Sequence, residues 1–226
     1  MIELGSGDYL YETTGQDWGN LQDDATYKEA TAVAVDAKDN VFVFNRGTHP
    51  MIVFNADGDI LDTWGHGVFA NPHGVSIGPD GSVYCVDNGD HTVKKFTPKG
   101  ELITELKAGH PAPAMSGDPF NRPCHLAIDG NTGNMFVADG YSNARVHKYD
   151  PEGRLLLSWG ESGTGPGQFN IVHNVIVDDD GFVYIADREN QRVQVFDTDG
   201  TFVTQWNDMS RVAAICMDPA GDDPLV

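Results

Sequence analysis

Two histidines stand at equivalent places in a chain that repeats itself. His73 and His173 each lie five residues before an alternating apolar stretch reaches its turn, and the same place holds Thr31, Cys124 and Ala213 in the other repeats. Neutral imidazoles that converge on one axis form zinc sites whose open positions take water or substrate. The spacing therefore predicts a metal site, with Cys124 as a candidate extra ligand. The alternative is that both histidines are polar residues bonded to water or backbone.

Two arginines and a tyrosine share a second equivalent place, just after the second apolar stretch of their repeats. They are Arg46 in FNRG, Tyr141 in DGYSN and Arg188 in DREN. A guanidinium group offers a planar fork of donors that suits an anionic or carbonyl-bearing ligand. A phenol beside such groups can serve as a general acid or base. The alternative for each arginine is an ion pair with one of the many acidic residues.

The remaining polar candidates favour structural roles. Asp187 with Arg192, and Asp139 with Arg145, lie across turns, and we expect each to form an ion pair that holds its turn. Six histidines lie outside the repeated register, and we expect them at the surface or in loops: His49, His66, His91, His110, His125 and His147.

The elements that must position these residues are short strands. Each repeat contains stretches that alternate between apolar and polar residues, and this alternation predicts strands. The DG, KG and EG pairs between them predict hairpin turns, because glycine adopts a positive φ at low cost. Four strands in a unit of roughly 40–45 residues are typical of a β-propeller blade. The sequence therefore predicts an all-β propeller of four-stranded blades in a single domain, 1–226.

The blades are predicted at residues 31–66, 67–108, 120–160 and 168–206, with 212–226 as the start of a fifth. Residues 1–30 are predicted to include a ring-closing strand, since YLYETTGQDWG resembles the fourth-strand endings DTWG and LSWG. A propeller needs closure to remove its exposed edges. We therefore expect a C-terminally incomplete propeller, closed by a missing segment or a partner chain. The alternative is a five-bladed ring with one degenerate blade.

The composition excludes several classes of function. The 226 residues include 34 acidic and 14 basic ones, for a net charge of −20. Such an acidic protein is not expected to bind nucleic acid or an anionic membrane, which both require Lys and Arg. A hydrophobic fraction of 40% suffices for a core. No apolar run reaches the ~18 residues of a membrane span.

The N-terminal residues and the cysteines bear on the compartment. The first residues contain no basic and apolar segments of a signal peptide, so we expect a cytoplasmic location. Three widely spaced cysteines do not form a disulfide framework.

Longer strings carry a resemblance to a known family. They are VAVDAKDNVFVFNRG, NPHGVSI, FVADGYSNARV, SWGESGTGPGQF, VHNVIV and ADRENQRVQVF, which cover most of residues 31–206. These strings resemble an NHL-repeat propeller, and more narrowly the catalytic domain of peptidyl-α-hydroxyglycine α-amidating lyase, also called peptidylamidoglycolate lyase. The resemblance implies a six-bladed propeller, of which four blades and part of a fifth are visible here.

The resemblance also implies roles for individual residues. The family holds a catalytic zinc with three histidines, two of which match His73 and His173, while the third belongs to a later segment. Its active-site tyrosine matches Tyr141, and its two active-site arginines match Arg46 and Arg188. A structural calcium in the family uses backbone carbonyl groups that match Val33 and Val75, together with an Asp of the later segment.

The implied activity is that of a zinc-dependent lyase. It would cleave the C–N bond of an N-acyl α-hydroxyglycine, a small or peptide-derived carbinolamide, into an amide and glyoxylate. Zinc would polarise the hydroxyl group, Tyr141 would take its proton, and the arginines would orient the substrate. One alternative is a non-catalytic NHL-repeat propeller that binds a ligand or protein. Another is a related metal-dependent hydrolase of a small carbonyl or hydroxylated compound.

Overall fold

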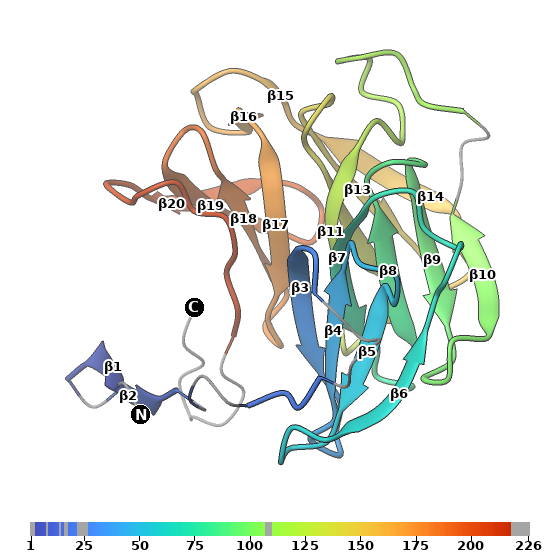
Figure 1. The fold of residues 1–226 in the computed structure, drawn as a ribbon. Coiled ribbons are helices and arrows are strands. Elements are labelled where there is room, and N and C mark those ends of the chain that lie inside the picture. The colour runs from blue at the N-terminus through green and yellow to red at the C-terminus, as the bar shows by residue number, and fades with distance from the viewer. Residues whose placement is uncertain are drawn as a thin grey trace.

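The computed structural model describes residues 3–7, 9–13, 15, 18–21, 27–106 and 110–217, and within these ranges it contains twenty strands and no helix (Figure 1). The described residues accordingly include no helix that could cross a membrane. Four sheets are four-stranded and antiparallel, with strands in sequence order. This arrangement confirms the predicted all-β fold of four-stranded propeller blades.

Each blade is one meander. Blade 1 contains β3 (Ala30–Val35), β4 (Val41–Asn45), β5 (Met51–Phe54) and β6 (Ile60–Trp64). Blade 2 contains β7 (Pro72–Ile77), β8 (Val83–Asp87), β9 (Thr92–Phe96) and β10 (Leu102–Leu106). Blade 3 contains β11 (Pro123–Ile128), β12 (Met135–Asp139), β13 (Arg145–Tyr149) and β14 (Leu155–Trp159). Blade 4 contains β17 (Val172–Val177), β18 (Phe182–Asp187), β19 (Arg192–Asp197) and β20 (Phe202–Trp206).

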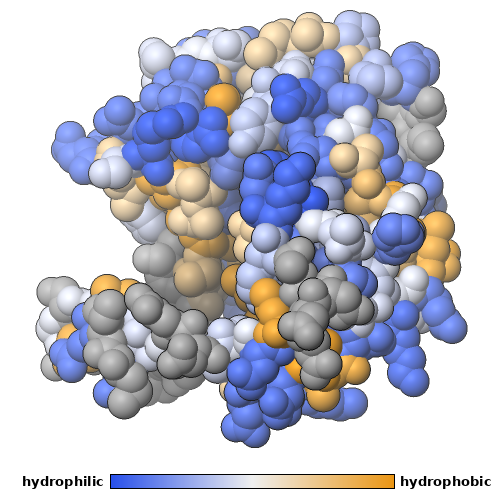
Figure 2. Space-filling model, viewed as in Figure 1, coloured by the Kyte–Doolittle hydropathy of each residue, from blue (hydrophilic) through white to orange (hydrophobic). Residues whose placement is uncertain are grey.

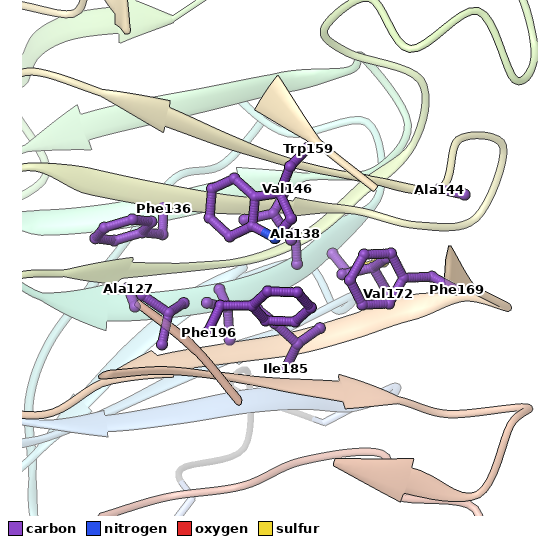
Figure 3. Close-up of a cluster of buried hydrophobic side chains, with 13 residues drawn as sticks. Ala127, Phe136, Ala138, Ala144, Val146, Trp159, Phe169, Val172, Ile185 and Phe196 are labelled. Carbon is purple, nitrogen blue, oxygen red and sulfur yellow. The ribbon is translucent and has the colours of Figure 1, made fainter. Parts of the chain in front are cut away.

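The first strands of neighbouring blades contact one another, β3 with β7, β7 with β11 and β11 with β17. They form the inner wall of the fold. Between blades 3 and 4 lies a cluster of buried side chains that includes Phe136, Trp159 and Phe196 (Figure 3). Similar clusters join blades 1 and 2 and blades 2 and 3. Hydrophilic residues cover much of the outer face (Figure 2), in keeping with the net charge of −20.

Tryptophans at the ends of fourth strands contact turn glycines of the following blade. Gly100 packs on Trp64 and Gly200 packs on Trp159, so closely that a Cβ atom at either glycine would overlap the indole. Trp18 packs on Gly58 of blade 1 and donates from Nε1 to the carbonyl group of Ala56 at 3.0 Å. Trp18 thus lies where a fourth-strand tryptophan of a preceding blade would lie.

The two ends of the described chain differ in part from the expectations. The strand β2 (Tyr9–Glu12) pairs with β1 (Glu3–Ser6) and with no blade in the described ranges, so a ring-closing strand there stays a prediction. Residues 211–217 form no strand, although the amide of Ile215 lies 3.4 Å from Asn174 Oδ1 of β17. Residues 218–226 of the predicted fifth unit lie outside the described residues. The short parallel pair β15 (Glu161–Ser162) and β16 (Gln168–Phe169) joins blades 3 and 4.

A buried polar residue ends the second strand of every blade: Asn45, Asp87, Asp139 and Asp187, each 0% exposed. The carboxylates accept hydrogen bonds from the loop that precedes the first strand of their own blade. The donors are the backbone amides of Asn71, Asn121 and Asn170 at 2.8–3.0 Å. Each carboxylate therefore ties together the two loops at one end of its blade.

The third strand supplies a polar partner, by ion pair or hydrogen bond, wherever the second ends in a carboxylate. Lys94 Nζ lies 3.8 Å from Asp87, His147 Nε2 lies 3.2 Å from Asp139, and Gln194 Nε2 lies 3.2 Å from Asp187. The equivalent position of blade 1 is Ile52, which pairs with Val43, and the second strand of that blade ends in the uncharged Asn45. An unpaired buried charge is costly, so a polar residue on the third strand accompanies the carboxylate in blades 2, 3 and 4 and is absent where the carboxylate is absent.

The two ion pairs expected from the sequence have different outcomes. Asp187 pairs with Arg192 as predicted, with Nε 2.8 Å from Oδ2. Asp139 contacts the buried His147 instead of Arg145, whose guanidinium packs against Gly117. The expectation that His147 lies in a loop or at the surface is therefore wrong, because it fills the donor position of blade 3.

Replacing the blade 4 carboxylate should destabilise the protein. Asp187→Asn leaves the buried guanidinium of Arg192 without its counter-charge, and we expect the free energy of unfolding to fall by about 3 kcal/mol. Urea unfolding at neutral pH measures the change. The matched control is Asp199→Asn in an exposed turn, where the Asp side chain is 86% exposed and 3.6 Å from Lys148. A loss no larger than that of the control would contradict this role for Asp187.

Candidate functional site

The two histidines that drew attention in the sequence lie at irregularities of their strands. The pairing of β7 shifts between Pro72 and Gly74, and that of β17 shifts between Val172 and Asn174. His73 and His173 are the residues inside these shifts. A bulge of this kind turns a side chain away from the regular alternation. Here it gives both imidazoles a place on the inner wall.

Each imidazole is bonded across a blade boundary. His73 Nδ1 lies 2.8 Å from the carbonyl oxygen of Cys124 in blade 3, and His173 Nδ1 lies 2.5 Å from that of Ala213. A carbonyl oxygen only accepts, so Nδ1 carries the hydrogen in the neutral ring. The Nε2 atoms therefore keep their lone pairs, as in histidines that bind metals.

Both lone pairs face the hydroxyl group of Tyr141. The Tyr141 oxygen lies 3.3 Å from His73 Nε2 and 3.1 Å from His173 Nε2, and Arg188 NH1 donates to it at 3.3 Å. The two imidazole centroids are 5.1 Å apart. One phenol hydrogen cannot serve two acceptors, so one Nε2 lone pair lacks a donor. A cation between the rings would satisfy this donor set.

The charge state of the imidazoles suits metal binding. Burial, followed by the nearby His173, lowers the pKa of His73 to about 4, and burial also lowers the pKa of His173. Both rings are thus neutral at neutral pH, which is the form that ligates a metal. Within the described ranges, no group of three or more His, Cys, Asp or Glu side chains is arranged to hold a metal ion. The pair would supply two of the four ligands of a tetrahedral zinc ion.

One rim position recurs in every blade. Its backbone N–H donates to a carbonyl group of the loop before the first strand of that blade. The four pairs are Arg46 to Glu29, Asn88 to Asn71, Tyr141 to Arg122 and Arg188 to Ile171, at 3.0–3.5 Å. The residues predicted as catalytic thus occupy this position in blades 1, 3 and 4.

Blade 3 differs from the others by one residue. Tyr141 follows Asp139 by two positions, whereas Arg188 follows Asp187 directly. The extra residue is Gly140, where a Cβ atom would lie 2.0 Å from the carbonyl oxygen of Val172. Only glycine allows the loop to approach β17 this closely. The approach places Tyr141 between the imidazoles of blades 2 and 4.

The two predicted arginines have acidic partners as well as neighbours in the site. Arg46 NH1 lies 2.5 Å from Glu29 while its Nε donates to the carbonyl group of Pro72 at 3.2 Å. Arg188 Nε lies 3.0 Å from Glu189, and its NH1 is the group that reaches Tyr141. The ion pairs considered as alternatives therefore form, without removing the contact between Arg188 and the phenol.

Cys124 serves the site through its backbone. Its thiol is fully buried in the cluster between blades 3 and 4, with Sγ 3.8 Å from the carbonyl oxygen of Arg122. Burial raises the pKa of this thiol to about 12. A metal-binding cysteine is a thiolate, so the carbonyl contact with His73 is the contribution that the structure supports.

A cavity of about 500 Å³ lies along the inner wall, and we call it the axial cavity. Both candidate metal ligands border it, together with residues of the first strands and of the segment after blade 4. The lining consists of Ala30, Thr31, Ala32, Val33, Val43, His73, Cys124, His125, His173, Asn174, Ala213, Ala214, Ile215 and Cys216.

His125 is a residue of this cavity that the sequence did not single out. It was expected at the surface or in a loop, which is wrong, because it lies on β11 beside the ring position of Cys124. Its Nδ1 is 3.2 Å from the carbonyl oxygen of Val175, and its ring also bonds the carbonyl group of Val75. A calcium ion at Val75 would compete with this imidazole. Val33, the other predicted calcium contact, lies on β3, and calcium there stays a prediction.

Comparison with known proteins identifies relatives with the same repeats. A family model described as "NHL repeat" matches residues 69–96 and 169–196. The chain is 31% identical to mouse peptidyl-glycine alpha-amidating monooxygenase over 76% of its own length and 21% of that protein. It is 34% identical to Drosophila melanogaster peptidyl-alpha-hydroxyglycine alpha-amidating lyase 1 over 76% and 34%, respectively. It is 36% identical to human NHL repeat-containing protein 3 over 77% and 54%.

Solved structures support the fold. A protein of unknown function from Bacteroides caccae has a TM-score of 0.59 at 17% identity, over 89% of this chain and 65% of that one. An inactive virginiamycin B lyase from Staphylococcus aureus has a TM-score of 0.60 at 11% identity, over 88% and 59%. The chain spans between a fifth and about half of the length of the curated relatives named above. It is an NHL-repeat propeller that resembles peptidyl-α-hydroxyglycine α-amidating lyase.

The buried state of His125 predicts a pH dependence of stability. Burial lowers its pKa to about 4, although its bonds to the carbonyl groups of Val175 and Val75 act in the opposite direction. Unfolding restores a pKa of about 6.5. Between these values the unfolded chain binds the proton, so this contribution to stability is lost as the pH falls.

When the pH falls from 7 to 5, we expect the free energy of unfolding of His125→Asn to decrease by about 2 kcal/mol less than that of the wild type. Urea unfolding at several pH values measures the difference. Above pH 7.5 the two profiles should run parallel, because His125 is then neutral in both states. Parallel profiles between pH 7 and 5 would contradict the assignment.

Proposed function

We propose that this chain forms the site of a zinc-dependent lyase that cleaves an N-acyl α-hydroxyglycine into an amide and glyoxylate. The observation that carries the proposal is the hydroxyl group of Tyr141, which lies within 3.3 Å of both Nε2 atoms and of Arg188 NH1. An acid–base group, two ligand nitrogens and a cationic donor thus converge on one point. The lyases among the relatives support the same reaction class.

His73 and His173 are the residues that would hold the zinc ion. Their Nδ1 atoms are fixed by carbonyl groups, their rings are neutral, and one Nε2 lone pair has no donor. When bound there, zinc supplies a Lewis acid for an oxygen of the substrate. The carbonyl contacts from Cys124 and Ala213 keep both rings in the orientation that such a ligand pair needs.

Tyr141 would handle the proton of the reaction. In the phenolate form, supported by the N–H of Arg188, its oxygen takes the proton of the substrate hydroxyl group. The electrons of that O–H bond become the carbonyl bond of glyoxylate, and the C–N bond breaks with its electron pair going to nitrogen. Tyr141 then returns the proton to that nitrogen, which completes the amide. The substrate is consumed without water, so the step is an elimination.

The arginines would stabilise negative charge around this step. Arg188 already donates to the phenol oxygen, and Arg46 borders the site from blade 1 through its contact with Pro72. Fixed donors of this kind stabilise an oxyanion without having to reorganise. Each arginine also has a glutamate partner that offsets its charge, and this favours the alternative of a non-catalytic binding propeller. The activity assay below distinguishes a lyase from a binding propeller.

Removing the phenol oxygen should abolish most of the activity. We expect Tyr141→Phe to lower kcat for glyoxylate release from α-hydroxyhippurate by about 100-fold or more, the usual effect of losing an acid–base group. The matched control is Tyr184→Phe, whose hydroxyl group bonds Asp178 at 2.8 Å and does not contact the site. Benzoate in place of benzamide would indicate the hydrolase alternative, because the α-hydroxyglycine left by hydrolysis itself breaks down to ammonia and glyoxylate. Equal rates for Tyr141→Phe and wild type would refute the role of Tyr141.

Metal content tests the histidine pair without reference to activity. We expect the purified protein to retain zinc and His73→Ala to lose it, because one imidazole alone is a weak ligand. Mass spectrometry of the metal after dialysis measures the stoichiometry, with His66→Ala, an exposed histidine near Thr48, as the control. Zinc that persists in His73→Ala, or is absent from the wild type, would exclude this site.

A further inference from the structure

A third arginine lies beside the phenol, although nothing in the sequence drew attention to it. Arg122 is an exposed residue in the loop before β11, and its Cζ is 5.3 Å from the centroid of the Tyr141 ring. Arg188 lies at the same distance from that ring. No carboxylate in the described part of the chain lies within 4 Å of the Arg122 guanidinium, in contrast to Arg46 and Arg188. Its terminal nitrogens are thus open to a ligand.

Asn88 holds this guanidinium in place. Its Oδ1 accepts from Arg122 Nε at 3.2 Å, and its Nδ2 donates to the carbonyl oxygen of Arg122, also at 3.2 Å. Asn88 is 1% exposed and occupies the rim position that Arg46, Tyr141 and Arg188 occupy in the other blades. In blade 2, therefore, the rim position orients an arginine of blade 3.

The backbone of Arg122 is held in an uncommon conformation. Its φ is 61°, in the left-handed region that few residues other than glycine adopt. Its N–H donates to His91 Nδ1 at 2.9 Å, and its carbonyl oxygen accepts from the Tyr141 amide at 3.5 Å. Ile171, the equivalent residue of blade 4, has a φ of 63°. The conformation therefore belongs to the repeat, and in blade 3 it holds the backbone of Arg122 beside Tyr141.

The rim is locally cationic in an acidic protein. Four arginines and two glutamates gather there: Arg46, Arg122, Arg188, Arg211, Glu29 and Glu189. The two glutamates contact the other three arginines, so the group keeps a net positive charge, and Arg122 is its member without an acidic partner among the described residues. A local positive potential in a chain of net charge −20 attracts small anions to this point.

We propose that Arg122 binds the carboxylate of the substrate and determines the preference of the site for anionic N-acyl amino acids. The guanidinium fork accepts a carboxylate in a two-point contact, while Tyr141 beside it faces the reacting hydroxyl group. The choice of substrate class rests on the proposed lyase function. The binding of the anion does not.

Binding of two matched probes tests the inference. Hippurate carries a carboxylate, and hippuramide is its neutral amide. The binding of each probe to the full chain is measured with zinc present. By calorimetry we expect the wild type to prefer hippurate by roughly tenfold or more, as for a charge-assisted bond. Arg122→Gln should remove that preference and leave hippuramide affinity unchanged. Arg122→Lys should retain part of it, because lysine keeps the charge but not the fork.

The control is Arg154→Gln, an exposed arginine of the β13–β14 turn that pairs with Asp150. It should bind both probes as the wild type does. Thermal unfolding verifies that each variant is folded, and Arg122→Asn provides a second neutral variant that tolerates positive φ. An unchanged preference in folded Arg122→Gln and Arg122→Asn would overturn the inference. So would a wild type that binds neither probe.

The assay of glyoxylate release keeps this test distinct from that of the proposed function. Hippurate binding that depends on Arg122, without glyoxylate release by the wild type, supports the anion site and rejects the lyase. Glyoxylate release whose KM is the same in Arg122→Gln as in the wild type supports the lyase and rejects the anion site.

Discussion

The structure depends on a carboxylate buried at the end of a second strand. In blades 2, 3 and 4 this group accepts hydrogen bonds from the loop before the first strand of its blade. The rim residue follows the buried carboxylate directly in blades 2 and 4 and by two positions in blade 3. The loop that donates to the carboxylate leads into the first strand, which begins next to the ring residue of the inner wall. One buried interaction in each blade thus fixes the distance between the two sets of residues from which the site is built.

The cost of this arrangement is a buried charge, and in each blade a different polar side chain contacts it. The contact is made by Lys94 in blade 2, by His147 in blade 3, and by Gln194 with Arg192 in blade 4. Blade 1 avoids the charge, because its second strand ends in Asn45 and its third strand has the apolar Ile52 at the partner position. A blade with a buried carboxylate needs a polar partner on its third strand, and a blade without one does not. The residue types at these two positions can therefore vary between blades while the arrangement of the strands stays the same.

The sequence predicts the blades and most of the site because both follow a period. Alternation locates the strands, and equal positions in the repeats bring together His73, His173, Tyr141 and Arg188. What breaks the period escapes such prediction. The pairing shifts at Cys124 as it does at His73 and His173, yet Cys124 contributes its carbonyl oxygen to the site while its thiol is buried between blades 3 and 4.

Arg122 escapes prediction for a related reason. It precedes the strand rather than following it, so a comparison of the loops after the second strands misses it. His125 escapes because it lies one residue outside the compared register.

The hydrogen bonds from the imidazoles cross the boundaries between repeats, and this has a thermodynamic consequence. His73 is bonded to blade 3 and His173 to the segment after blade 4, so each ring keeps its orientation only while neighbouring units stay in place. Any ligand that favours this orientation must favour the packed arrangement of the units by the same free energy. Ligand binding at the two imidazoles and the packing of the neighbouring blades are therefore thermodynamically coupled.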